Sequence, residues 1–158
     1  MSREFLAETV AGLKQRLGEG FAGQRDDRQE LTAWVQPDRW TEAARYLKME
    51  RGFEFLSDLT AVDYLDRAPR FDVAAVFLSL THKATLRVKT MLDESAPLDS
   101  LTLVWPCANW YEREIYDLFG IQFHHHPNLT RILLPPDYHG HPLRKDYPVT
   151  GPAGSPYR

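Results

Sequence analysis

One stretch of the sequence, FDVAAVFLSLTHKATLRVKTML (residues 71–92), decides the fold. Over residues 85–92 apolar side chains alternate with polar ones, which is typical of a strand in a sheet with one solvated face. Residues 71–81 form a second strand pattern, and only a very short link at His82-Lys83 separates the two. So tight a connection implies antiparallel neighbours. A third strand is expected over residues 58–65, joined by a short turn.

Helical and connecting segments are predicted before these strands. Apolar residues recur at helical spacing over residues 2–17, and Gly18 ends the pattern. The segment 18–29 reads as a glycine-containing connection and a charged turn that lead into a short strand over residues 30–36. A second helix opens at a proline and spans the region 37–52.

Two further helices are predicted after the strands, a short one over residues 98–104 and a longer one that ends at Gly120. Asn109 is expected to cap the longer helix, and Glu112, three residues later, to complete a capping box by bonding back to the Asn109 backbone N–H. Gly120 tolerates the left-handed conformation that ends a helix. The order helix, strand, helix, three strands, two helices predicts an α+β fold, a mainly antiparallel sheet packed with helices.

The chain changes character after the longer helix. We expect a compact α+β domain over residues 1–120 and an extended, Pro-rich C-terminal arm over residues 121–158. The arm holds prolines at positions 127, 135, 136, 142, 148, 152 and 156, too many for a helix or a central strand. Apolar and tyrosine side chains from Ile132 to Tyr157 are spaced along it, unlike a disordered tail. Such an arm is suited to gripping a neighbouring protein.

Composition narrows the class of protein. The 158 residues suffice for one domain, and a formal net charge of −3 gives no reason to expect nucleic acid as a partner. No apolar stretch approaches the roughly 20 residues that a bilayer requires, and the charges within residues 2–17 argue against a signal peptide. A single cysteine, Cys107, excludes an internal disulfide framework, favours a cytoplasmic compartment and is expected to be a small core residue.

The longer helix concentrates charge. Glu112, Arg113 and Asp117 are expected on its solvated face, with Arg113 and Asp117 four residues apart and able to pair. Glu114 falls at the edge of the apolar stripe, where a carboxylate needs a partner. The stretch could therefore be an active site, a metal site or a surface that holds another protein.

Catalytic and metal sites have weaker support than a protein interface. Two carboxylates on one exposed helix do not supply the separated acid and base that hydrolysis needs, and no phosphate loop or nucleophile elbow is present. His124 and His126, or His139 and His141, could meet on one side of an extended chain and bind zinc, but no cysteine lies nearby to complete a structural site. Their alternative role is as surface or interface hydrogen-bond donors.

The order of these residues resembles a known family. The resemblance rests on the runs Glu112-Arg113-Glu114, Asp117-Leu118-Phe119-Gly120, His126, Arg131-Ile132-Leu133 and Gly140-His141-Pro142-Leu143-Arg144-Lys145-Asp146-Tyr147-Pro148. Together they resemble the C-type subunit of respiratory complex I, the proton-translocating NADH:quinone oxidoreductase. The likeness covers essentially the whole chain.

The resemblance implies a scaffold subunit without a cofactor of its own, since FMN and the iron–sulfur clusters belong to partner subunits. It implies docking on the larger D-type subunit in the hydrophilic arm of the complex, peripheral to the cytoplasmic face of the inner membrane. The catalytic activity then belongs to the assembly. Residues expected at the partner interface are Glu112, Arg113, Glu114, Asp117, His126, Arg131, His141, Arg144, Lys145 and Asp146.

Two other functions stay open from the sequence. A related membrane-bound hydrogenase, or a ferredoxin- or F420-dependent complex, could use an equivalent subunit. A free-standing metal-dependent hydrolase is a third hypothesis, and it predicts stoichiometric zinc in the purified protein.

Overall fold

The fold is built on one mixed sheet. The structure, a computed structural model, describes residues 2–151. Within them the strands lie in the order β1-β2-β5-β4-β3. Their bounds are β1 Phe21–Asp27, β2 Glu30–Val35, β3 Phe55–Asp63, β4 Phe71–Ser79 and β5 Ala84–Leu92. The pairs β1–β2, β3–β4 and β4–β5 are antiparallel and the pair β2–β5 is parallel, so the predicted mainly antiparallel α+β fold is confirmed.

The strands agree with the sequence pattern except at one edge. The predicted hairpin over residues 71–92 is present, with Leu86 opposite Phe77 and Val88 opposite Ala75 on the buried face. The prediction of a connection and turn over residues 18–29 was wrong, because most of that segment is the edge strand β1. Its side chains are mostly exposed, so it lacks the alternation that reveals a half-buried strand.

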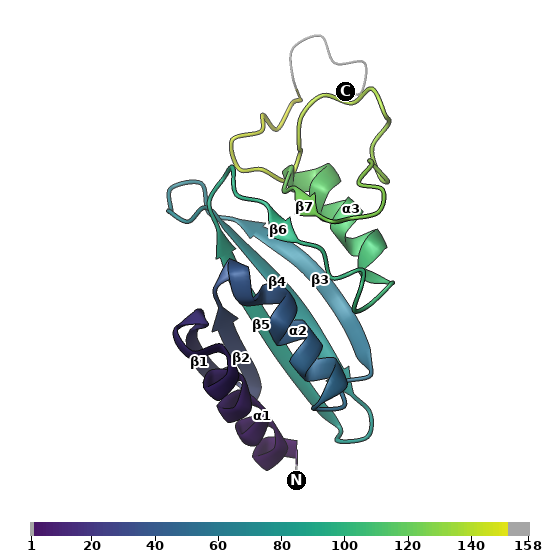
Figure 1. The fold of residues 1–158 in the computed structure, drawn as a ribbon. Helices are drawn as coiled ribbons and strands as arrows, with labels where there is room; N and C mark the ends of the chain where they lie inside the picture. Colours follow the sequence, from purple (N-terminus) through teal and green to yellow (C-terminus); the bar gives the residue numbers. More distant parts are fainter. Residues whose placement is uncertain (1, 152–158) are drawn as a thin grey trace.

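Two helices cover one face of the sheet. These are α1 (Ser2–Leu17) and α2 (Trp40–Met49), which lie side by side in front of the strands (Figure 1). Both were predicted, and both direct their apolar residues inward, with Leu13 and Leu47 fully buried. No helix within residues 2–151 combines the length and the apolar character needed to cross a bilayer.

One more helix and two short strands lie at the end of the sheet away from the N-terminus (Figure 1). Helix α3 (Ala108–Phe119) packs beside β3, and the short strands β6 (Leu98–Asp99) and β7 (Phe123–His124) pair in parallel (Figure 1). The predicted helix over 98–104 was wrong, because β6 and a series of turns occupy that segment.

The start of α3 also differs from prediction, and its end does not. Cys107 occupies the N-cap position without a side-chain cap, while Asn109 already lies within the helix, so the predicted capping box is absent. Cys107 is exposed and is not the core residue that was predicted. Gly120 ends the helix in the left-handed conformation at φ 78°, as predicted.

The chain beyond Gly120 begins inside the core. Ile121 and Phe123 are 2% and 4% exposed, and from residue 125 to residue 151 the chain has no helix or strand. The proposed domain boundary at Gly120 stays a prediction. Pro152, Pro156 and Tyr157 of the predicted arm lie outside the described residues.

Candidate partner interface at α3 and the C-terminal arm

Glu112 lies on the buried stripe of α3 and not on its solvated face. Ala108, Glu112, Ile115 and Phe119 recur at helical spacing, and each is buried. The prediction that Glu112 faces solvent was therefore wrong. Including Ala108 in the apolar pattern would have centred the stripe on Glu112.

The Glu112 carboxylate is held by the turn after β6. It accepts hydrogen bonds from Ser100 Oγ and from the backbone N–H of Leu101, both at 2.6 Å. Burial raises the pKa of Glu112 to about 7, although these two hydrogen bonds favour the ionised form. Glu112 therefore fastens α3 to β6 and titrates near neutral pH.

His126 packs beside Glu112 in the same buried site. Its Nε2 lies 3.9 Å from Glu112 Oε2, and neither side chain is exposed. The backbone N–H of Asn128 donates to Nδ1, which leaves Nε2 to donate to the carbonyl of Asn109 at 3.3 Å. Burial lowers the pKa of His126, so the ring is neutral and acts as an internal brace.

Asp117 is the anchor of the arm. Its side chain is fully buried, and Oδ2 accepts the backbone N–H groups of Ile132, Leu133 and Leu134 at 3.0, 2.8 and 2.9 Å. Arg131 Nη1 donates to Oδ1 at 2.6 Å. Burial alone would raise the pKa of Asp117, but these four donors outweigh it and hold the pKa below its ordinary value.

The predictions for the Asp117 carboxylate were wrong in two respects. It does not face solvent, and its cationic partner is Arg131 of the arm instead of Arg113 of its own helix. Arg113 donates to the carbonyls of Thr130 and Arg131 at 3.0 and 3.1 Å. Both contacts bind α3 to the arm, so the helix and the arm recognise each other chiefly through carboxylate-to-backbone and guanidinium-to-backbone hydrogen bonds.

The arm then passes close to the end of α3. His141 Nδ1 lies 2.9 Å from the carbonyl of Asp117, and burial lowers the pKa of its ring. Arg144 Nε donates to the carbonyl of Phe119 at 2.6 Å. A Cβ at Gly120 would lie 2.6 Å from His141 Cδ2 and 2.9 Å from Arg144 Nη2. Glycine is required here both for its φ and for this close approach.

A second anchor, Arg70, was not identified from the sequence. Its guanidinium is 7% exposed and pairs with the fully buried Asp63 through two hydrogen bonds of 2.7 and 2.8 Å. It also reaches Asp146 at 2.9 Å and Glu94 at 3.0 Å. The hydrogen bonds from Arg70 hold the pKa values of Asp63 and Asp146 below their ordinary range.

Residues 144–146 of the arm complete this network. The backbone N–H of Lys145 donates to Asp63 Oδ2 at 2.7 Å, and Arg144 pairs with Glu94 at 2.9 Å. The side chains of Lys145 and Asp146 remain exposed. Asp63 lies seven residues before Arg70 in the predicted strand 58–65, whereas Asp146 lies 76 residues after it, so local periodicity did not reveal the network.

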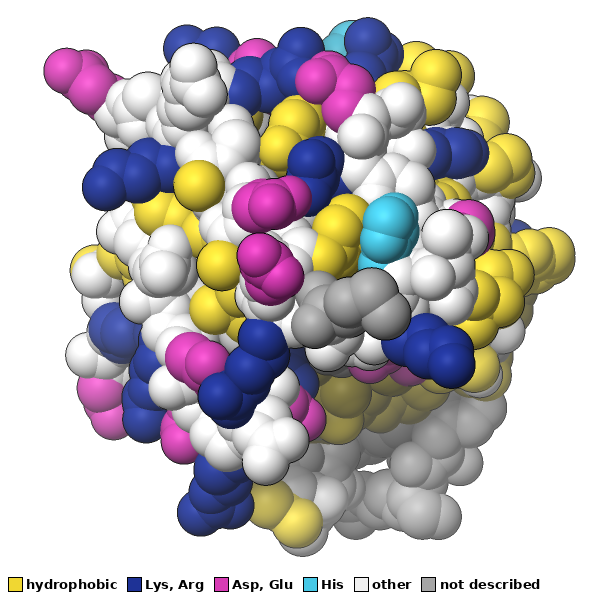
Figure 2. All heavy atoms as spheres, turned by 90° about the horizontal axis from the view of Figure 1, so that it is seen from below, with side chains coloured by type: hydrophobic (Ala, Val, Ile, Leu, Met, Phe, Trp, Pro, Cys, Tyr) yellow, Lys and Arg dark blue, Asp and Glu magenta, His cyan; other side chains and the backbone are white. Residues whose placement is uncertain are grey.

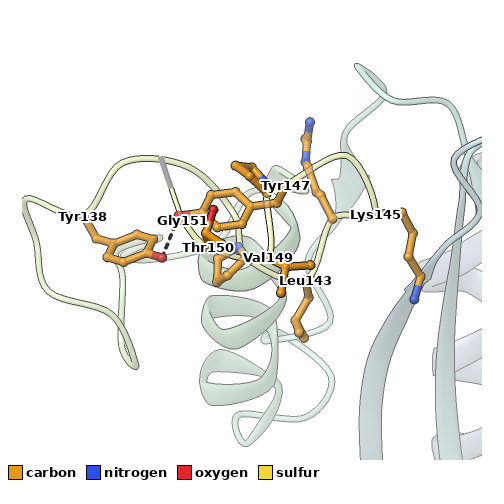
Figure 3. Close-up of a pocket in the computed structure, with 10 residues that line it drawn as sticks. Tyr138, Leu143, Lys145, Tyr147, Val149, Thr150 and Gly151 are labelled. Carbon is orange, nitrogen blue, oxygen red and sulfur yellow. Dashed lines mark hydrogen bonds between the residues drawn. The ribbon is translucent and has the colours of Figure 1, made fainter. Parts of the chain in front are cut away.

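An open hollow of about 990 Å³ lies on the arm itself. Tyr138 and Tyr147 line it side by side with their hydroxyl oxygens 2.7 Å apart, and Leu143, Lys145 and Val149 are among its other lining residues (Figure 3). The hollow is open to solvent.

The histidines considered as metal ligands are dispersed. His126 and His141 are engaged with backbone carbonyls, whereas His124, His125 and His139 are exposed. Within residues 2–151 no three His, Cys, Asp or Glu side chains are grouped in a way that could hold a metal ion.

The expected interface residues thus divide into two groups. Internal hydrogen bonds or ion pairs engage the side chains of Glu112, Arg113, Asp117, His126, Arg131, His141, Arg144 and Asp146. Glu114 is exposed and takes part in no hydrogen bond or ion pair within residues 2–151, and the Lys145 side chain is also exposed. Contact of any of them with a partner stays a prediction.

The end of the molecule opposite α3 has a mixed surface. Seen from below, acidic and basic side chains are interspersed there (Figure 2). Such a mixed surface is typical of a solvated face. Nothing in the described part of this lower face singles it out as a partner interface.

Comparison with known proteins gives consistent matches. The family model described as "Respiratory-chain NADH dehydrogenase, 30 Kd subunit" matches residues 33–153. The C-type subunit of NADH-quinone oxidoreductase from Citrifermentans bemidjiense is 44% identical over 150 residues, covering 94% of this chain and 93% of that protein. The equivalent subunit from Geobacter sulfurreducens is 42% identical over 151 residues, with coverage of 94% and 93%.

A solved structure shares the fold. A chain from the membrane-bound sulfane sulfur reductase, an archaeal respiratory membrane complex, superposes with a TM-score of 0.75 at 23% identity. The match covers 90% of this chain and 85% of that one.

Proposed function

The chain belongs to the family of the 30 kDa subunit of respiratory-chain NADH dehydrogenase, and we propose that it is a non-redox scaffold subunit of proton-translocating NADH:quinone oxidoreductase that docks on the D-type subunit. The resemblance to the C-type subunit noted from the sequence is confirmed. In this proposal the chain sits in the hydrophilic arm of the complex, at the cytoplasmic face of the inner membrane, and meets the membrane only through its partners.

The observation that carries the scaffold role is how the charged side chains are used. Asp117, Arg70 and Glu112 would be the natural candidates for chemistry, yet each is committed to hydrogen bonds that fasten the arm or β6 to the domain. A catalytic group must instead be within reach of a substrate. These side chains build a rigid shape, which is what a docking subunit needs.

The absence of a redox centre in this subunit is proposed from the sequence. An iron–sulfur cluster is typically held by about four cysteine thiolates, and the chain has a single cysteine. FMN and the clusters are accordingly assigned to partner subunits.

The docking role is supported by apolar side chains exposed around α3 and along the arm. Trp110 is 61% exposed, Leu133 59%, Leu143 49% and Val149 105%. Exposed apolar groups of this size mark protein–protein contact sites when they occur together. Internal hydrogen bonds hold the backbone N–H groups of Trp110, Leu133 and Leu143.

Co-purification tests the proposal. The chain, carrying an affinity tag and replacing its untagged copy, is extracted from membranes in a gentle detergent. We expect equimolar D-type subunit and an NADH-binding flavoprotein in the eluate, and loss of NADH:quinone activity from membranes that lack the chain. Recovery with a hydrogenase, ferredoxin- or F420-dependent electron-input protein would assign the chain to one of these related complexes instead of complex I. Recovery of the chain alone, with stoichiometric zinc, would favour the hydrolase.

The isolated chain provides a second test. We expect no visible absorption band and no oxidation of NADH by quinone. A band that survives chelation and gel filtration would contradict the non-redox assignment.

A further inference from the structure

The surface where α3 meets the edge strand β3 has an unusual construction. Ser57 is the extra residue of a β-bulge in β3, since Leu56 pairs with Phe77 while Asp58 pairs with Val76. The Tyr111 hydroxyl of α3 donates to the Ser57 carbonyl at 3.1 Å. The bulge thus joins the helix to the sheet edge and places Asp58 beside it.

Trp110 lies on this surface with the guanidinium of Arg113 beside its ring. It is 61% exposed, and the guanidinium carbon of Arg113 lies 5.3 Å from the centre of its ring. Arg113 is itself held by the carbonyls of Thr130 and Arg131. Because its support is already ordered, the indole would lose little freedom when a partner covers it.

The charge around Tyr111 is negative. Asp58 and Glu114 are both exposed, and neither side chain has a hydrogen bond or ion pair within residues 2–151. Burial contributes most to the raised pKa of the Tyr111 hydroxyl, and the charges of Cys107, Asp58 and Glu114 add to the rise. Arg113, the nearest cation on α3, is turned toward the arm.

We propose that Asp58, Trp110, Tyr111 and Glu114, the α3–β3 surface, receive a basic segment of the D-type subunit. A lysine or arginine of that segment lies between the two carboxylates, and an apolar side chain next to it packs on the indole. This inference rests on the proposed function and specifies which face of the chain makes the contact.

Charge complementarity selects this occupant. Two unpaired carboxylates beside an exposed indole attract a cation and repel an anionic surface. In a two-fold symmetric dimer formed through this surface, a second copy of the chain would bring the same acidic groups against each other, and an anionic membrane would be repelled. A basic protein segment satisfies both carboxylates and covers the aromatic ring, the residue type most enriched among interface hot spots.

Binding of the full chain to the purified D-type subunit tests the inference. The test variants are Glu114→Lys, Asp58→Lys and Trp110→Ala. Glu19→Lys is the matched charge control, and Met49→Ala, at a side chain 78% exposed, is the matched apolar control. Thermal unfolding of each free variant verifies that exposed substitutions leave the fold intact.

We expect each test variant to weaken binding by about tenfold or more, and each control by less than about twofold. Wild-type affinity should fall as NaCl rises from about 50 to about 500 mM, and this dependence should flatten in the variant that carries both lysine substitutions.

Undiminished binding of all three test variants, with wild-type binding intact, would overturn the assignment of the α3–β3 surface and leave the proposed function standing. Tighter binding of Glu114→Lys would overturn it in favour of an acidic partner. Failure of the wild-type chain to bind the D-type subunit would overturn the proposed function and this inference with it.

Discussion

Replacement of Asp117 by alanine should detach the arm from the domain. The carboxylate accepts hydrogen bonds from the backbone N–H groups of residues 132–134 and from Arg131. Hydrogen bonds to a charged group contribute about 1.5–3 kcal/mol each, so four of them could sum to about 6–12 kcal/mol if every donor stayed buried.

The donors do not stay buried, because the arm is only half-buried and can move into water. We therefore expect Asp117→Ala to lower the free energy of unfolding by about 3–5 kcal/mol, the range for breaking one buried charged pair. A loss of this size is a large part of the roughly 5–15 kcal/mol that stabilises a typical domain.

Urea unfolding of the full chain followed by tryptophan fluorescence measures the loss, and amide hydrogen exchange locates it. The amides of residues 132–134 should lose protection while those of β4 and β5 keep theirs. Asp26→Ala, at an exposed carboxylate of β1, is the control and should change stability by less than about 0.5 kcal/mol. If Asp117→Ala unfolded like this control, with residues 132–134 still protected, the anchor role of Asp117 would be refuted.

Three further perturbations test the same end of the fold. Because the pKa of Glu112 is raised from 4.5 to about 7, its contribution to stability is complete below pH 4.5 and is lost as pH rises through 7. Glu112→Gln should abolish that part of the pH dependence, on the order of 3 kcal/mol, in unfolding curves taken from about pH 4 to about pH 8. Gly120→Ala combines a φ of 78° with a clash against His141 and should cost about 2–4 kcal/mol in urea unfolding, whereas Gly18→Ala, with φ 55° and open space, should cost about 1–2. Truncation after Gly120 removes the buried Phe123, so the remaining chain should melt lower and less cooperatively than wild type, and an unchanged calorimetric transition would show that the domain ends at Gly120.

The sheet was predictable where one face is buried and the other is wet. The alternation over residues 85–92 reports burial directly, and the tight link at His82 leaves the chain no alternative to a hairpin. Strand β1 lacked that signal because it lies at the edge and exposes most of its side chains. The parallel pairing of β2 with β5 depends on which distant strands meet, which local periodicity does not report.

The charged residues of α3 were harder to place for the same reason. Local spacing suggested an Arg113–Asp117 pair, but a helix pair of this kind is worth about 0.3–0.5 kcal/mol, far less than four hydrogen bonds from the arm. The donors to Asp117 lie 14 to 17 residues further along the chain, beyond the reach of any helical pattern. The family resemblance identified Asp117 and Arg131 as a set, and the structure adds that they bind each other.

Residues that fix the arm and exposed residues near α3 should respond differently to substitution when binding to the partner is measured. Asp117 and Arg70 fix the arm in the free chain, so the entropy of ordering it is lost during folding and not during docking. Asp117→Ala should then weaken binding to the D-type subunit roughly in proportion to its loss of stability, with the salt dependence of wild type. Glu114→Lys should weaken binding while unfolding stays unchanged, and it should reduce the salt dependence, because Glu114 has no hydrogen-bond or ion-pair partner in the described part of the chain and its proposed contact forms only in the complex. Measuring both quantities for both variants separates a residue that shapes the interface from one that touches the partner.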